Sequence, residues 1–216
     1  MEALLGKSIT KVSNGMNIRM DLDKRLSLDK DCNILLIGMN GSGRTKVIKD
    51  LIRQFEKDEN TYLLLITSTA SEYKTFPNLN IESAERVNDS YEVRDALNHM
   101  INVNNSKKIR TVIFVDDNFI LYKQNLLSFI ENLSLISKVH NCLVISTWNR
   151  IQRIPLSILK SSSVLEIFKL YTTDVSVNDH IKLKGLTDKI LKTTLNFRRG
   201  QRILSVDNNL IMIESE

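Results

Sequence analysis

Residues 34–45 read ILLIGMNGSGRT, and this stretch decides the fold of the chain. The apolar run at 34–37 is typical of a strand buried on both faces of a parallel sheet. The next eight residues match the phosphate-loop pattern GxxxxGK[ST], except that Arg44 stands in the place of lysine. Apolar residues at helical spacing follow over 45–57. This order predicts a phosphate-binding loop, and the alternative is a glycine-rich turn that binds nothing.

The backbone of such a loop does most of the binding, because its glycines let successive N–H groups turn inward around phosphate oxygens. The positive N-terminal end of the following helix adds to this attraction. The sequence therefore predicts that ATP and Mg²⁺ bind here, with Mg²⁺ on the hydroxyl of Thr45. The residues expected to contact the nucleotide are Gly38, Asn40, Gly41, Ser42, Gly43, Arg44 and Thr45.

Arg44 is a departure that affects catalysis more than binding. Lysine is a compact point charge that fits between the β- and γ-phosphates, whereas arginine is planar and longer. Nucleotide binding can survive the exchange because the loop glycines are intact. We expect Arg44 to reach the phosphates differently, and ATP hydrolysis to be slow or degenerate.

Strands and helices alternate along the rest of the chain. Further buried strands are predicted at 62–67, 111–115, 142–146 and 164–170, and helices at 90–102, 125–138 and 186–195. Less regular segments are a loop with room for a short strand at 77–87, one or two short strands at 16–28 with a turn near Asp23–Lys24, and a terminal hairpin at 201–214. The expected fold is α/β: a mostly parallel central sheet flanked by helices, with a small β-hairpin at each end.

Polar residues end two of the predicted strands, where ligands of parallel sheets bind. Asp116 is expected to hold Mg²⁺ through water, and Asp117 occupies the place of a carboxylate that activates the attacking water. Thr147, at the end of the 142–146 strand, is expected to sense the γ-phosphate as a further catalytic residue. The alternative in each case is an ordinary polar strand end.

The chain has 216 residues and a mass of 24.8 kDa, enough for one α/β core. Its net charge is +5, and residues 150–202 hold eleven basic against four acidic side chains. This basic span suits a polyanion such as nucleic acid, or is a solvated surface. Cys32 and Cys142 show no metal-ligand spacing, and no apolar run approaches the length of a membrane span, so a cytoplasmic location is expected.

Four segments together resemble the FtsK/HerA branch of the P-loop ATPases. They are residues 20–45, 112–118 (VIFVDDN), 133–159 and 196–204 (NFRRGQRIL). The resemblance extends from about Leu5 to Ile213, although only the loop and the Asp116-Asp117 strand are specific. It implies a P-loop NTPase fold of the RecA and FtsK/HerA type, with one ATPase domain over 1–216. Within that domain we expect an N-terminal β extension (1–30), a core (31–200) and a C-terminal hairpin (201–216).

The resemblance also implies a motor that assembles with copies of itself as a ring, usually a hexamer. An arginine of the neighbouring subunit completes the nucleotide site, and Arg150 and Arg153 are the candidates. The substrate in this family is DNA, or a secreted protein at a membrane-anchored type VII secretion complex. Two departures stand beside Arg44: Asp117 replaces a glutamate, and Trp148 replaces the glutamine of a Thr-Gln pair.

The function we expect is ATP-driven translocation of DNA for packaging or transfer. The alternative is a degenerate, weakly hydrolysing ATPase module of a type VII-like protein-secretion motor. The basic span and the length of a single domain favour DNA. A small P-loop kinase is disfavoured because the segment after Thr67 (STASEYKTFPNLN) has no arginine to bind a second substrate.

Overall fold

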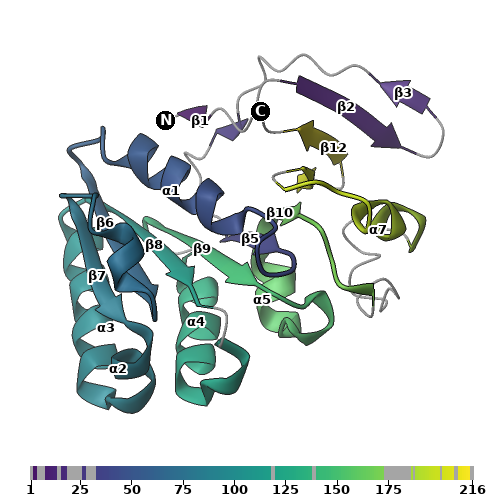
Figure 1. Cartoon of the computed structure of the whole chain (residues 1–216). Coiled ribbons are helices and arrows are strands. Elements are labelled where there is room, and N and C mark those ends of the chain that lie inside the picture. The colour runs from purple at the N-terminus through teal and green to yellow at the C-terminus, as the bar shows by residue number, and fades with distance from the viewer. Residues whose placement is uncertain are drawn as a thin grey trace.

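The computed structural model describes residues 2–3, 8–13, 16–18, 26–27, 33–117, 120–137, 140–172, 186, 188–199, 201–206 and 209–214. Its centre is one large sheet with helices on both faces (Figure 1). The α/β class expected from the sequence is confirmed. Among the described residues, no helix is long and apolar enough to cross a membrane.

Six parallel strands form the core of the sheet. In spatial order they are β10 (Ser162–Ile167), β5 (Asn33–Ile37), β9 (Cys142–Trp148), β8 (Arg110–Asp116), β6 (Thr61–Thr67) and β7 (Leu79–Ser83). Each neighbouring pair is parallel. The predicted buried strands are confirmed, since their apolar runs lie in the core on both faces of the sheet. Because all six strands run the same way, their carboxyl ends lie along one edge.

Antiparallel strands extend the sheet beyond β10. They are β11 (Arg202–Val206), β12 (Asn209–Glu214), β2 (Ser8–Ser13) and β3 (Met16–Ile18). The predicted terminal hairpin is confirmed as the pair β11–β12, and residues 207–208 lie outside the described part of the chain.

The N-terminal strands differ from the expected pairing. β3 and β4 (Leu26–Ser27) fall within the range 16–28, but β3 pairs with β2, and β4 pairs with β1 (Glu2–Ala3). The turn expected near Asp23–Lys24 lies outside the described residues, as does Cys32.

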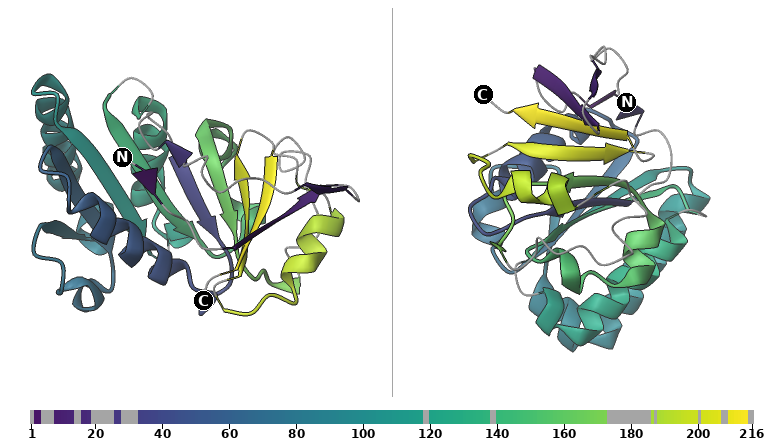
Figure 2. Two further views of the ribbon diagram at one scale, coloured as in Figure 1. Left: turned by 90° about the horizontal axis from the view of Figure 1, so that it is seen from above. Right: turned by 90° about the vertical axis from the view of Figure 1, so that its right-hand side faces the viewer.

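The side chains of β5 alternate between two cores, because successive residues of a strand point to opposite faces. Ile34 and Leu36 pack beneath α1 (Arg44–Phe55). Leu35 and Ile37 belong to the cluster on the other face, which contains residues of α2 (Ala84–Asp89), α3 (Tyr91–Ser106), α4 (Gln124–Ile136) and α5 (Leu156–Ser161). Figure 1 shows α1 on one face and these four helices on the other. Figure 2 shows α7 (Asp188–Thr194) near the C-terminal hairpin, far from β7.

Two short helices were not expected. The short strand allowed for within 77–87 is present as β7, but the residues after it form the helix α2, and α5 was not predicted either. β7 is the edge strand of the parallel core, and of its residues only Leu79 is buried, so its apolar signal is weak. α5 has six residues, which is too short for a helical period to be recognised.

A buried ion pair joins the parallel core to the hairpin. Arg202 Nε in β11 lies 2.8 Å from Glu166 Oε2 in β10, and the two side chains are 6% and 1% exposed. The guanidinium carbon also lies 5.7 Å from the centroid of the Phe168 ring. Burial raises the pKa of Glu166, and the charge of Arg202 opposes that rise. Arg202 belongs to the basic span, but it is enclosed in the fold and not part of an exposed surface.

The Arg202→Met substitution should lower the free energy of unfolding near neutral pH by about 3 kcal/mol, because Glu166 then keeps a buried charge without its cation. The loss should shrink as the pH falls, since a protonated Glu166 has no charge to bury. Its raised pKa places that change above the usual glutamate range. Urea unfolding at about pH 5 and about pH 8 measures both effects.

The matched control is the double variant Glu166→Leu/Arg202→Met, which replaces the pair by apolar side chains. It should recover most of the lost stability. Equal losses in the single and double variants would show that the uncompensated charge of Glu166 is not the cause of the loss.

Candidate nucleotide-binding site

The loop between β5 and α1 has the backbone of a phosphate cradle. Gly41 (φ 76°) and Gly43 (φ 111°) are left-handed, a conformation that is inexpensive only for glycine. Gly43 is the N-cap of α1, which begins at Arg44. The first N–H groups of a helix have no acceptor within it, so the start of α1 attracts an anion.

Two hydrogen bonds hold the base of the loop. Gly38 N–H donates to the Trp148 carbonyl at the end of β9 (2.9 Å), and Met39 N–H donates to the Lys169 carbonyl just after β10 (2.8 Å). A Cβ on Gly38 would lie 2.7 Å from Phe168 Cβ and 3.1 Å from the Lys169 carbonyl oxygen. The strands on either side of β5 therefore set the position of the loop.

A groove of about 430 Å³ opens over the loop and the first turns of α1, within the usual volume of small-molecule sites. Five basic and two acidic side chains line it, namely Arg44, Lys46, Lys49, Arg53 and Arg199, with Asp50 and Glu72. A second pocket of about 400 Å³ shares Asn40, Gly41 and Arg199 with the groove. The excess of positive charge around glycine N–H groups fits a polyphosphate.

Two polar side chains of the loop are buried. Ser42 Oγ has no hydrogen-bond partner among the described residues, so a phosphate oxygen would satisfy it. Arg44 is 6% exposed and donates from Nη2 to Asn40 Oδ1 (3.1 Å). Burial lowers the pKa of Arg44, while Asp116 and Tyr171 act in the opposite direction. The guanidinium is therefore held inside the loop before any ligand arrives.

The carboxylate of Asp116 accepts hydrogen bonds from hydroxyls of three elements. Thr45 Oγ1 donates to Oδ2 (3.0 Å) and Thr147 Oγ1 donates to Oδ1 (2.9 Å). Tyr73, from the 3₁₀ turn η1 (Ala70–Tyr73), donates its hydroxyl to Oδ2 as well. The residues predicted to hold Mg²⁺, Thr45 and Asp116, thus lie in direct contact, and a hydroxyl and a carboxylate are suitable donors for that ion.

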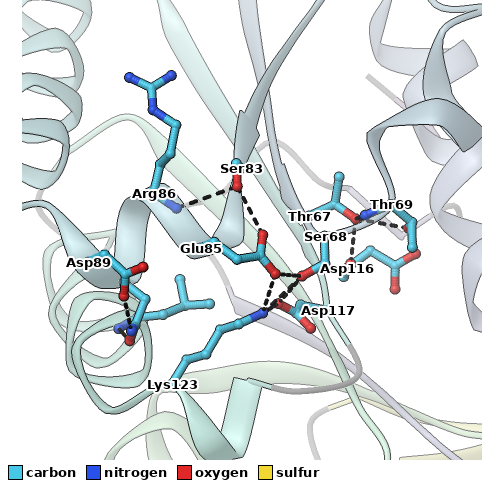
Figure 3. A network of polar contacts seen from close by, with 12 residues as sticks. Thr67, Ser68, Thr69, Ser83, Glu85, Arg86, Asp89, Asp116, Asp117 and Lys123 are labelled. Atoms are coloured by element: carbon cyan, nitrogen blue, oxygen red, sulfur yellow. Dashed lines mark hydrogen bonds and ion pairs between the residues drawn. The ribbon is translucent and has the colours of Figure 1, made fainter.

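Asp117 is directed away from Asp116, towards α2 and the start of α4 (Figure 3). Its side chain is 1% exposed, forms an ion pair with Lys123 and accepts a hydrogen bond from Ser68 Oγ (2.9 Å). Lys123 also lies 3.2 Å from Glu85, whose pKa is lowered to about 2, mainly by a hydrogen bond from Ser68. The carboxylate of Asp117 is therefore bound to Lys123 and Ser68, and it faces away from the glycine loop.

The end of β9 contributes one side chain to the site. Thr147 reaches Asp116, whereas Ser146 Oγ accepts a hydrogen bond from Trp148 Nε1 (2.8 Å). Trp148 is 1% exposed and packs in the core. Trp148 stands where the resemblance implies a glutamine, and its side chain packs in the core instead of reaching the site.

The two candidate arginines for a neighbouring site are placed differently. The guanidinium carbon of Arg150 lies 5.0 Å from the ring centroid of Tyr171 in the same chain. Arg150 therefore contacts an aromatic ring of its own chain. The side chain of Arg153 lies outside the described residues.

Three residues at the site were not found from the sequence. Tyr73 and Lys123 lie in connecting segments and belong to no motif, so nothing in the sequence distinguishes them. Arg199 lines both the groove and the second pocket. It lies in the segment NFRRGQRIL, so the sequence did contain a signal for it.

No protein-family model matches the chain, and no curated protein matches its sequence. Solved structures do match it. B204, the DNA-packaging ATPase from Sulfolobus Turreted Icosahedral Virus, matches with a TM-score of 0.65 and 13% identity, over 88% of this chain and 100% of the viral chain. The genome packaging NTPase B204 from Sulfolobus turreted icosahedral virus 2, in complex with AMPPCP, matches with a TM-score of 0.65 and 15% identity, over 86% and 98% of the two chains.

A secretion ATPase has the same fold. ATPases 2 and 3 of Thermomonospora curvata EccC, in complex with a signal sequence peptide, match with a TM-score of 0.67 and 10% identity, over 89% of this chain and 39% of that chain. These proteins are FtsK/HerA-type P-loop ATPases. The chain therefore has the fold of that class, and the resemblance drawn from the sequence is confirmed at the level of the fold.

The Gly38→Ala substitution should lower the free energy of unfolding by about 3 kcal/mol, because the new methyl group would collide with Phe168 Cβ and the Lys169 carbonyl. Gly41→Ala is the matched control: its Cβ meets nothing within 4 Å, and its cost of about 1 kcal/mol comes only from the left-handed φ. Chemical denaturation compares the two. A Gly38→Ala protein as stable as Gly41→Ala would show that the base of the loop is not tightly enclosed.

Proposed function

We propose that this chain is an ATP-binding motor domain of the FtsK/HerA type that couples ATP hydrolysis to translocation of DNA, in genome packaging or transfer. One observation carries the proposal: the positive groove over the glycine loop is joined to a candidate magnesium site, because Thr45 lines the groove and contacts Asp116. The match to nucleotide-bound B204 supports it.

The triphosphate would lie in the groove, with its oxygens on the N–H groups of residues 41–45. Thr45 and Asp116 would hold Mg²⁺, which when bound neutralises charge on the β- and γ-phosphates. Arg44 and Arg199 supply further positive charge in the groove. Thr147 would sense the γ-phosphate through its bond to Asp116. Asp117 would activate the attacking water once it has left Lys123.

We assign DNA as the substrate, and a ring of copies of the chain, most simply a hexamer, as the working assembly. The viral packaging ATPase B204 is matched over its whole length, whereas the matched region is 39% of the EccC chain. Lys160, Lys192 and Arg198 of the basic span are exposed, so they are available to a polyanion. In such a ring, Arg150 or Arg153 would complete the neighbouring site.

The alternative is a weakly hydrolysing module of a protein-secretion motor. It is favoured by the position of Asp117, whose carboxylate is buried and paired with Lys123. Arg44 also favours this alternative, because it stands in the place of lysine and is held by a hydrogen bond to Asn40. Such a module would bind ATP tightly and turn it over slowly.

The test of the proposal is ATP hydrolysis with and without double-stranded DNA. We expect Mg²⁺-dependent binding of a fluorescent ATP analogue and a hydrolysis rate that DNA raises several-fold at low salt. The stimulation should fall as salt increases, because DNA binding by basic side chains releases counterions. Thr45→Val, which removes the hydroxyl that contacts Asp116, should abolish hydrolysis. Tight nucleotide binding without stimulation at any salt concentration or DNA length would favour the secretion module instead.

The Lys123→Met substitution should raise the basal rate of hydrolysis several-fold, because it frees the Asp117 carboxylate from its cation. Adding Asp117→Asn should remove that gain and leave nucleotide binding unchanged. Lys107→Met, at an exposed lysine just after α3, is the matched control and should behave as the unmodified chain. An unchanged rate in a folded Lys123→Met protein would show that the ion pair does not restrain hydrolysis.

A further inference from the structure

The hydroxyl of Tyr73 donates to the same oxygen of the Asp116 carboxylate that accepts a hydrogen bond from Thr45. Tyr73 and Thr45 both donate to Oδ2 of Asp116, and Thr147 donates to Oδ1. With donors on both oxygens, the carboxylate cannot rotate without losing a hydrogen bond. The donors come from three elements that are far apart in the sequence: α1, η1 and β9.

Tyr73 itself is held rigidly. Its residue is 0% exposed, and its ring packs against Phe76 at a centroid distance of 6.3 Å. Lys49 Nζ lies 5.1 Å from the ring centroid, and Lys49 is paired with Glu72 (3.5 Å). A carboxylate oxygen can only accept, so in the bond to Asp116 Oδ2 the Tyr73 hydroxyl is the donor. The side chain is therefore a fixed donor, unlike a hydroxyl on a mobile chain.

Among the three donors, Thr45 is the one that the metal would take as a ligand. Its hydroxyl has one O–H and two lone pairs, so it could hold Mg²⁺ through a lone pair and still donate to Oδ2 of Asp116. Among the side chains that the structure describes, Tyr73 is the donor to Oδ2 that is not itself a candidate metal ligand, while Thr147 donates to Oδ1. Outer-shell hydrogen bonds of this kind orient metal-holding carboxylates.

We infer that Tyr73 positions the Asp116 carboxylate for Mg²⁺, because it holds Oδ2 from a buried ring and is not itself a metal ligand. The inference rests on the proposed nucleotide site. Tyr73 is a positioning residue: it acts on the metal through Asp116 and does not touch the nucleotide.

The test is the Mg²⁺ dependence of nucleotide binding by Tyr73→Phe, which removes the hydroxyl and keeps the ring. The fluorescence of a bound ATP analogue is titrated with Mg²⁺, and affinity without metal is measured in EDTA. We expect the affinity in EDTA to be unchanged and the Mg²⁺ concentration at half-saturation to rise about tenfold. The matched control is Tyr62→Phe. Tyr62 lies near the start of β6, whereas Asp116 pairs with the last residue of that strand, so the substitution should leave both quantities unchanged.

An unchanged Mg²⁺ midpoint in a folded Tyr73→Phe protein would overturn the inference and leave Tyr73 as a core side chain only. If the unmodified chain binds no Mg²⁺-nucleotide at all, the proposed function fails, and the inference fails with it. Where Tyr73→Phe lowers the melting temperature too far for titration, a fluorotyrosine at position 73 keeps the hydroxyl. Its fluorine NMR signal should shift when Mg²⁺ is added at saturating nucleotide, and no shift would contradict the inference.

Discussion

The position of β9 between β5 and β8 is the constraint on which the site depends. The parallel register pairs Leu36 of β5 with Thr147 of β9, and Val115 of β8 with Ser146 of β9. The loop that follows β5 and the acid that ends β8 therefore lie on opposite sides of one polar strand end. Thr147 bonds Asp116 from between them, while α1 brings Thr45 to the same carboxylate. The site is a property of the whole sheet edge, and no single loop could form it.

Asp116 and Asp117 are neighbours in sequence with separate environments. One step along a strand reverses the direction of the side chain. Asp116 faces Thr45 and Tyr73 on the side of α1, and Asp117 faces Lys123 on the side of α2 and α4 (Figure 3). The two acids proposed for metal binding and for water activation therefore contact different layers of the fold.

Much of the fold could be predicted because its signals are local. The loop glycines, the apolar run at 34–37 and the periodicity of α1 gave the element types from neighbouring residues alone. The edge strand β7 was expected only as a short strand within a loop, because a single one of its residues is buried, and the helices α2 and α5 were missed because each has six residues. At the site, Thr45 and Asp116 were expected close together because both were predicted to hold Mg²⁺, and the structure adds their direct hydrogen bond. Tyr73 and Lys123 were not expected, because connecting segments have no period that fixes their direction in space.

The sequence by itself determined the chemistry available to this protein: a glycine-rich loop, a hydroxyl at its end, and acids at the end of a buried strand. The loop, the hydroxyl and the acids can be read from residue type and spacing, because the local backbone geometry requires particular residues at particular intervals. Only the tertiary structure decided how that chemistry is arranged. It packed Trp148 in the core, paired Asp117 with Lys123, enclosed Arg202 with Glu166 and brought Tyr73 to Asp116. The physical reason is that burial and pairing depend on which elements meet, and those meetings join residues far apart in the chain.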